Sequence, residues 1–155
     1  MPKHVLAKLE AEHKALKHAL LMDIPKEIAA AASQGDLSEN AEYEQALAKR
    51  DMYQGRLVAL ERRISEVARL DVTRLPEDKI AYGSRVKLLD LDSEKEVTYR
   101  LVLSEELDND PELLSISSPI GAALVGLEEG EEVTIRIPAG TKRFEVIELR
   151  TIHQQ

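Results

Sequence analysis

The sequence predicts an α+β protein in two parts, an N-terminal antiparallel coiled-coil helical hairpin followed by a small antiparallel sheet domain with one short helix. Through the first 70 residues, apolar side chains recur at steps of three and four, the period of a helix packed along one face. Later in the chain the pattern changes to the apolar–polar alternation that is typical of strands. We therefore expect a hairpin over 1–72, a linker over 73–82 and a sheet domain over 83–155.

The first helical arm shows helical spacing with one interruption. Its apolar positions are Leu9, Leu16, Leu20, Ile24, Ile28 and Ala31. The spacing shifts near Asp23, and Pro25 follows directly, with a ring nitrogen that has no hydrogen to donate. We therefore expect the first arm to bend or restart at Pro25.

The second arm has a more regular pattern, an a/d seam held for more than three heptads. Its seam positions are Tyr43, Ala46, Arg50, Tyr53, Leu57, Leu60, Ile64 and Val67. Arg50 and Tyr53 fit such a seam because each can bury its apolar stem and keep its polar end in water. Gly35 can end the first helix and Asp36 can begin the second, which predicts an antiparallel hairpin. With arms of about 30 residues, the hairpin would project roughly 45 Å.

The hairpin tip, residues 35–43, reads GDLSENAEY. Asp36 and Glu39 are three residues apart, so both carboxylates can gather at the end of the second helix if that helix begins at Glu39. Two carboxylates suit Mg²⁺, which leaves its remaining positions to water and phosphate oxygens. The same spacing is also a capping box, in which Asp36 accepts the backbone N–H of Glu39 and no metal is needed. The spacing alone leaves both interpretations open.

Five strands are expected in the second half. They cover residues 84–89, 96–103, 113–117, 132–137 and 143–149. The turns between them are short, which favours antiparallel neighbours. One segment, 117–126, breaks the alternation: Ser118 can cap a short helix there, and Pro119 can take its first position.

Charge is distributed unevenly between the halves. Residues 71–155 contain 10 Lys or Arg against 18 Asp or Glu, whereas residues 1–70 contain 11 of each, so the second half accounts for the net charge of −8. An acidic domain repels free nucleic acid, because phosphate neutralisation supplies most non-specific affinity. One Phe, four Tyr and no Trp also provide no stacking surface for bases.

Other classes of protein are excluded by what the sequence lacks. The absence of Cys excludes disulfides, thiolate zinc sites and cysteine nucleophiles. No run of 18 apolar residues and no signal peptide are present, so we expect a soluble, cytoplasmic protein without a membrane partner. No internal catalytic constellation was found, so any chemistry would have to be completed by a partner and the chain itself is not expected to be an enzyme.

The motifs together resemble a known family. GDLSENAEY at a hairpin turn, SPIG inside a small sheet domain, a G-x-x-x-G-E-E-V segment and a terminal RFEVIEL are similar to those of the bacterial Gre transcript cleavage factors, nearest to the GreA branch. The match spans nearly the whole chain. The resemblance implies an FKBP-like C-terminal domain that binds RNA polymerase and a hairpin that enters the polymerase's secondary channel, with the chain acting as a monomer.

The resemblance also implies roles for individual residues. Asp36 and Glu39 match the acidic tip residues that help to hold a second Mg²⁺ at the polymerase active centre, where water attacks the backtracked RNA near its 3′ end. The loop that faces the polymerase rim is matched by Ser118, Pro119 and Ile120. Family members carry basic residues near the tip that are thought to meet the RNA. Here the first arm has none at that place, which leaves Lys49 as the available RNA-proximal cation.

Two other functions are compatible with the pattern. A channel-occupying regulator of the same fold would compete for the polymerase without promoting cleavage, but the intact acidic pair favours a cleavage factor. A coiled-coil chaperone or peptide-binding module would need an aromatic-lined pocket, which five aromatic residues can hardly provide.

Overall fold

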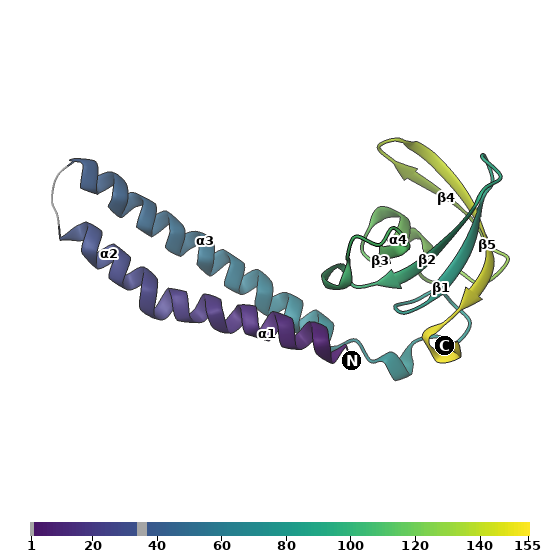
Figure 1. Ribbon diagram of the computed structural model, residues 1–155, viewed down its shortest axis with the longest axis horizontal. Helices are drawn as coiled ribbons and strands as arrows, with labels where there is room; N and C mark the ends of the chain where they lie inside the picture. The colour runs from purple at the N-terminus through teal and green to yellow at the C-terminus, as the bar shows by residue number, and fades with distance from the viewer. Residues whose placement is uncertain (1, 34–36) are drawn as a thin grey trace. The chain divides into compact units, whose positions relative to one another are not determined.

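The computed structural model describes residues 2–33 and 37–155, with side chains in the first turn of the long helix described from residue 41 onward. The chain forms two compact units, Met1–Leu70 and Asp71–Gln155, the first all helical and the second built on a sheet (Figure 1). The predicted α+β class is therefore confirmed. The finer boundaries of hairpin, linker and sheet domain stay a prediction.

The first unit is an antiparallel helical hairpin. One arm consists of α1 (Lys3–His18), the π-helical turn η1 (Ala19–Asp23) and α2 (Ile24–Ala32), and the other arm is α3 (Leu37–Ala68). Two side-chain contacts cross between the arms: His13 Nε2 lies 3.0 Å from Glu61 Oε1, and Lys49 Nζ lies 3.1 Å from Glu27 Oε1. Because the partner's residue number falls as the first arm's number rises, the arms run in opposite directions, as predicted.

The first arm changes its helical form at Pro25, which confirms the expected irregularity. The backbone N–H of Ile24 donates to the carbonyl of Ala19, five residues earlier, so the turn before Pro25 is a π turn. Pro25 then occupies the first turn of α2, where its missing N–H is tolerated. A π turn contains one residue more than an α turn, and this extra residue accounts for the shift of the apolar spacing near Asp23.

The seam between the arms is the predicted one. Every seam position of α3 is buried or half-buried, with Ala46 and Val67 buried. The buried side chains of the first arm are Val5, Leu6, Leu9, Ile24 and Ala31. Arg50 is half-buried and directs its guanidinium to Asp51, 3.3 Å away, so its stem packs while its charged end stays in water.

The second unit contains a five-stranded sheet in the order β3-β2-β1-β5-β4. The strands are β1 (Arg85–Asp90), β2 (Glu96–Val102), β3 (Leu113–Ser115), β4 (Glu132–Ile137) and β5 (Gly140–Arg150). The prediction of a wholly antiparallel sheet is wrong for β3, which pairs parallel to β2. Its connection to β2 is not a tight turn, because it contains the 3₁₀ turn Ser104–Glu106 and returns the chain to the end where β2 begins.

The core of the second unit lies between one face of the sheet and the short helix α4 (Pro119–Leu124). It is formed by Val86, Leu88, Leu101, Leu124, Ile135, Phe144 and Val146, together with Ile80. Ile80 falls in the stretch expected as a linker, yet it is only 1% exposed and exchanges backbone hydrogen bonds of 2.8 Å with Gly126 and Leu127. The helix predicted in segment 117–126 is confirmed.

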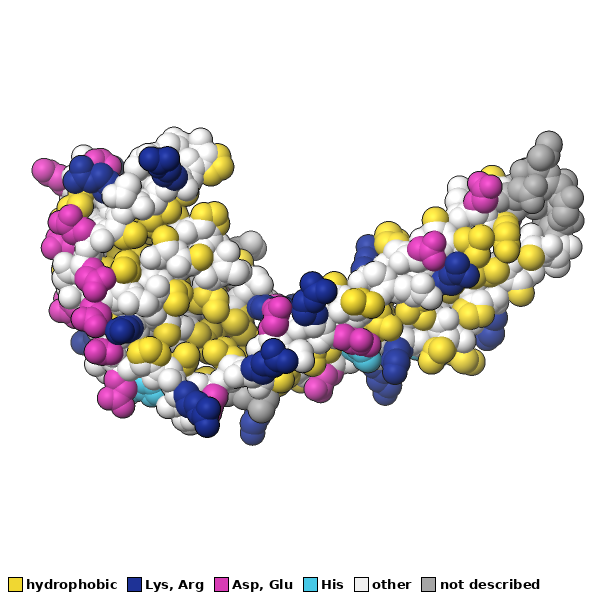
Figure 2. All heavy atoms as spheres, turned by 180° about the vertical axis from the view of Figure 1, so that it is seen from behind, with side chains coloured by type: hydrophobic (Ala, Val, Ile, Leu, Met, Phe, Trp, Pro, Cys, Tyr) yellow, Lys and Arg dark blue, Asp and Glu magenta, His cyan; other side chains and the backbone are white. Residues whose placement is uncertain are grey.

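The surface of the second unit is rich in acidic residues. Viewed from behind, acidic side chains gather along one edge of this unit and hydrophobic side chains lie towards the middle of the same face (Figure 2). Among the residues that the structure describes, no helix is long and apolar enough to cross a membrane.

Candidate functional site

The hairpin end holds the two residues expected to be catalytic. Asp36 lies outside the described residues. Glu39 is in the first turn of α3, which begins at Leu37, and its side chain is not described. The roles of Asp36 and Glu39 as metal ligands or as a capping box therefore stay a prediction.

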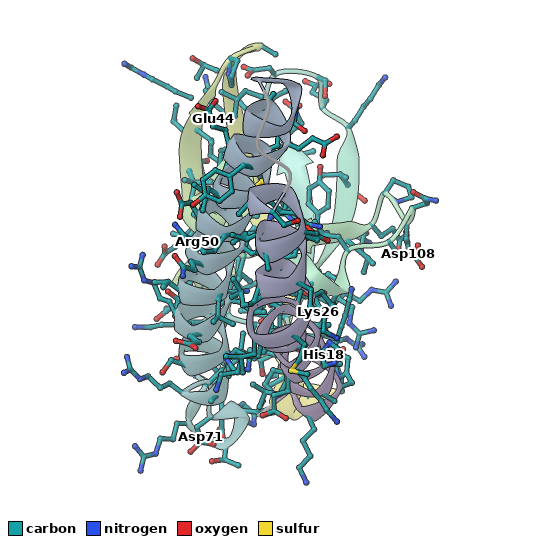
Figure 3. The ribbon with its side chains drawn as sticks, turned by 90° about the vertical axis from the view of Figure 1, so that its left-hand side faces the viewer. His18, Lys26, Glu44, Arg50, Asp71 and Asp108 are labelled. Atoms are coloured by element: carbon teal, nitrogen blue, oxygen red, sulfur yellow. The ribbon has the colours of Figure 1, made fainter. Side chains whose placement is uncertain are left out.

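Lys49, the expected RNA-proximal cation, forms an ion pair with Glu27. Its Nζ donates to both carboxylate oxygens of Glu27 across the hairpin, at 3.1 and 3.2 Å, and lies 5.6 Å from the centre of the Tyr53 ring. The hydrogen bond to Glu27 raises the pKa of Lys49. Because the pair is exposed, solvent and salt weaken it. Figure 3 shows how charged side chains such as Lys26 and Arg50 surround the two arms.

A hollow of about 370 Å³ lies beside this ion pair, between α2 and α3. It is lined by Glu27, Ala30, Ala31, Glu42, Gln45, Ala46 and Lys49. Its two carboxylates come from opposite arms. Among the side chains of residues 2–33 and 41–155, however, no three His, Cys, Asp or Glu come together in a way that could hold a metal ion.

The loop before α4 holds the three residues expected to face the polymerase. Ser118 Oγ accepts the backbone N–H of Gly121 at 3.1 Å and donates to the carbonyl of Ser115 at 2.6 Å. Its hydroxyl is thus used in capping α4, as the sequence predicts, while Pro119 is exposed at the first helical position. Ile120 is half-buried and packs against the core.

Ile120 also lines a hollow of about 450 Å³ on the same side of the sheet. The hollow is lined by Asp90, Ser93, Lys95, Glu96, Val97, Tyr99, Ile120, Lys142 and Phe144. Apolar side chains are joined there by a charged pair, since Lys142 Nζ lies 3.7 Å from Asp90 Oδ2. This hollow was not predicted from the sequence. Strand alternation could have found it, because Tyr99 and Phe144 both fall at inward-facing positions.

The Asp90 carboxylate is held at the edge of this hollow by the turn that follows β1. The backbone N–H groups of Ser93 and Asp92 donate to Asp90 Oδ1 at 3.2 and 2.9 Å. These hydrogen bonds, with a smaller contribution from Lys142, lower the pKa of Asp90 from its ordinary value of 3.8. The rim therefore keeps a fixed negative charge beside an exposed lysine.

The two units match the two parts of one family. Residues 1–68 match the family model described as transcription elongation factor, N-terminal, and residues 75–151 match transcription elongation factor, GreA/GreB, C-term. The transcription elongation factor GreA of Hyphomonas neptunium is 40% identical over 92% of this chain and 91% of that protein. The GreA of Rickettsia canadensis is 42% identical over 92% of this chain and 88% of that protein.

Among solved structures, GreA factor homolog 1 of Thermus thermophilus is 23% identical, covers 94% of each chain and superposes with a TM-score of 0.43. The Thermus aquaticus Gfh1 is 25% identical, with a TM-score of 0.43 over 96% of this chain and 92% of that one. The family assignment comes from the sequence matches over both units, and it makes the chain an elongation factor rather than an enzyme in its own right. This chain belongs to the GreA/GreB family of transcription elongation factors.

Proposed function

We propose that this elongation factor binds RNA polymerase through its sheet unit, places its hairpin in the polymerase's secondary channel and stimulates the polymerase's own cleavage of backtracked RNA. The observation that carries the proposal is the antiparallel hairpin in which GDLSENAEY joins α2 to α3. The similarity to GreA proteins over most of the chain supports a role in elongation.

The dimensions of the hairpin suit insertion into a narrow channel. Helix α3 has 32 residues, which at 1.5 Å per residue gives a rod of about 48 Å. The rod is only two helices wide, about 20 Å with side chains. The apolar seam runs along most of its length, so the two arms support each other and the tip can be presented far from the hairpin's base.

The chemistry of the tip residues fits a shared metal ion. Asp36 and Glu39 supply two carboxylates, which are hard oxygen ligands of the kind that Mg²⁺ takes, and too few to hold it without the polymerase. When bound there, Mg²⁺ would lower the pKa of a water and orient it towards the RNA phosphodiester. The chain's own contribution is to hold negative charge at the tip and, through Lys49 once released from Glu27, to contact the RNA phosphate.

The hollow beside α4 suits a protein partner. It combines an apolar surface from Ile120, Tyr99 and Phe144 with a charged rim at Asp90 and Lys142. Protein interfaces commonly have this arrangement of an apolar centre and a polar rim. Ser118 and Pro119 would then act by fixing the position of Ile120 at the edge of the docking surface.

The test is a transcript-cleavage assay on a stalled, backtracked elongation complex. The intact chain should shorten the RNA from its 3′ end, and the chain without polymerase should cleave nothing. Asp36→Asn and Glu39→Gln should each reduce stimulated cleavage by a factor of about 100 or more, the scale expected when a group that stabilises developing charge is removed. Asparagine caps helices as well as aspartate does, and glutamine can serve in a capping box, so both variants should stay folded.

Glu42→Gln is the matched control, because it removes one exposed negative charge from α3 about one turn after Glu39, outside the Asp36–Glu39 pair. It should keep near-normal stimulation. The Asp36 and Glu39 variants should still compete with the unmodified chain for polymerase. If they also keep near-normal stimulation, the acidic pair is only a helix cap and the protein is better described as a channel-occupying regulator.

A further inference from the structure

The outward face of the sheet carries a row of three arginines. Arg85 on β1 lies directly opposite Arg100 on β2 and directly opposite Arg150 on β5. Directly opposed residues point to the same face, and this face is turned away from the core because the next residue, Val86, is completely buried. Like charges placed in this way repel one another. The row contrasts with the unit as a whole, which contains 18 Asp or Glu against 10 Lys or Arg.

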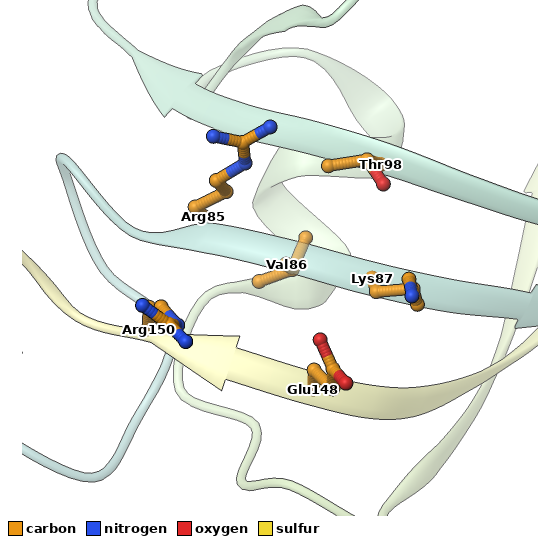
Figure 4. A pocket seen from close by; sticks show the side chains of 6 residues that line it. All are labelled: Arg85, Val86, Lys87, Thr98, Glu148 and Arg150. Carbon is orange, nitrogen blue, oxygen red and sulfur yellow. The ribbon is translucent and has the colours of Figure 1, made fainter.

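A hollow of about 300 Å³ lies on this row (Figure 4). It is lined by Arg85, Val86, Lys87, Thr98, Glu148 and Arg150. Three cationic side chains and one carboxylate therefore surround it, which leaves a local excess of two positive charges. Lys87 pairs across the strands with Thr98 on one side and Glu148 on the other, so these residues form a second row next to the arginines.

Two of the cations have no ion-pair partner among the residues that the structure describes. Arg100 donates to Gln155 Oε1 at 3.3 Å, and Lys87 Nζ lies 3.8 Å from Glu96 Oε2. For Arg85 and Arg150, the described part of the chain places no carboxylate within ion-pair distance of the guanidinium. Arg85 and Arg150 thus border the hollow from neighbouring strands, whose backbones lie about 5 Å apart.

We infer that this hollow binds a compact phosphate anion of the pyrophosphate class. Guanidinium groups present paired N–H donors that match phosphate oxygens, and the Lys87 ammonium and the Thr98 hydroxyl add donors from the second row. A ligand with several oxygens and more than one negative charge uses this donor set more fully than a single carboxylate does. An extended nucleic acid is a poorer ligand, because its affinity depends on many phosphate contacts and the acidic residues elsewhere on the unit repel it.

This site is separate from the proposed polymerase contact. Ile120 packs on the opposite, core-facing side of the sheet, so occupation of the arginine hollow does not require the docking hollow beside α4. Failure of one proposal therefore leaves the other standing.

The first experiment titrates inorganic pyrophosphate into the full chain by calorimetry at fixed ionic strength and without Mg²⁺. Binding tighter than about 1 mM is expected, with sodium sulfate and succinate at the same ionic strength binding more weakly. Arg85→Gln and Arg150→Gln should each weaken pyrophosphate binding about tenfold or more, the effect of losing one charge-assisted pair of hydrogen bonds. Arg136→Gln is the matched control, because it removes an exposed arginine from β4 of the same sheet, outside the hollow, and should bind as the unmodified chain does.

A second measurement separates binding from folding. Without a ligand, Arg85→Gln should raise the melting temperature of the sheet unit by about 2 °C, because it relieves repulsion from both neighbouring arginines. With saturating pyrophosphate the order of the two melting temperatures should reverse, so that the unmodified chain melts at a higher temperature than Arg85→Gln. Three results would overturn the proposal: no pyrophosphate binding, equal binding by the Arg85 and Arg136 variants, or tighter binding of a single-stranded oligonucleotide or an acidic peptide than of pyrophosphate.

Discussion

Glu27 of α2 and Lys49 of α3 form an ion pair across the hairpin, in which both carboxylate oxygens accept from the same ammonium, at 3.1 and 3.2 Å. The pair lies on the part of the hairpin nearer the tip and is exposed to solvent. The cation that was expected to lie near the RNA is therefore engaged in the isolated chain, and under the proposed function RNA would have to displace Glu27 from it.

Two substitutions that break this pair should have opposite effects on cleavage. Lys49→Gln removes the cation and should lower stimulated cleavage, whereas Glu27→Gln releases the cation and should raise it a few-fold at low salt, where screening is weakest. The measurement is the rate of transcript shortening in backtracked complexes at two salt concentrations. If both substitutions change the rate in the same direction, Lys49 only stabilises the hairpin and does not contact RNA.

The docking role of Ile120 can be separated from its packing role. Ile120→Asn should weaken binding to RNA polymerase at least about tenfold, because a polar amide replaces an apolar side chain that lines the proposed docking hollow. Ala122→Asn is the control on the same helix, at an exposed position outside the hollow. Binding is measured by competition against the labelled chain. Equal affinities for the two variants, both folded by circular dichroism, would place the polymerase contact elsewhere.

Gly121 is required by close packing at the start of α4. A Cβ built on it would overlap the backbone carbonyl oxygen of Ser115, which also accepts from Ser118 Oγ. Gly121→Ala should therefore destabilise the sheet unit by about 2 kcal/mol or more. Gly55→Ala, in the middle of α3 with open space around it, should instead stabilise the hairpin by about 0.5–1 kcal/mol. Denaturant unfolding, followed separately for each unit, measures whether the free energy of unfolding falls in Gly121→Ala and rises in Gly55→Ala.

The acid stability of the sheet unit should depend on Asp90. Because hydrogen bonds from Ser93 and Asp92 lower the pKa of Asp90 in the folded chain, its ionised form favours folding. This contribution is present above the unfolded pKa, near 3.8, and is lost as the pH falls through the lower folded pKa. Asp90→Asn should therefore reduce the fall in melting temperature between about pH 4 and pH 2.

The control is Asp78→Asn, an exposed carboxylate in the same unit. It should leave the pH dependence of the melting temperature unchanged. A melting curve for Asp90→Asn that declines with acid as steeply as that of the unmodified chain would show that this carboxylate does not link protonation to folding.

Local patterns in the sequence were sufficient for most of the fold. The seam of α3 was predictable because apolar residues that recur at steps of three and four over many turns form one continuous face, which a second helix can cover. The short helix was predictable from Ser118 and Pro119, whose side chains act within one turn of where they stand in the sequence. The direction of β3 was not, because it depends on how the preceding segment crosses the end of the sheet, and short-range turn signals carry no information about that.

The candidate sites also divide into those that lie within one local motif, which could be predicted, and those formed by distant segments, which could not. The tip carboxylates could be singled out because Asp36 and Glu39 stand in one short motif, but their spacing left a metal site and a helix cap both open, and the family resemblance alone favoured the metal. The arginine row was not found, because Arg85, Arg100 and Arg150 are brought together only by strand pairing between distant segments. The partner of Lys49 was also missed, because Glu27 lies on the other arm and its register depends on the extra residue of the π turn.

That π turn constrains how the first arm can vary in length. Between Ala19 and Asp23 the arm contains one residue more than a continuous α-helix would, and both the apolar positions before it and those after it face α3 only because of this residue. Deleting one residue there would turn the arm into a regular helix with Pro25 in its interior, where the ring clashes with the preceding turn. A deletion in this segment should therefore be tolerated only together with a replacement of Pro25.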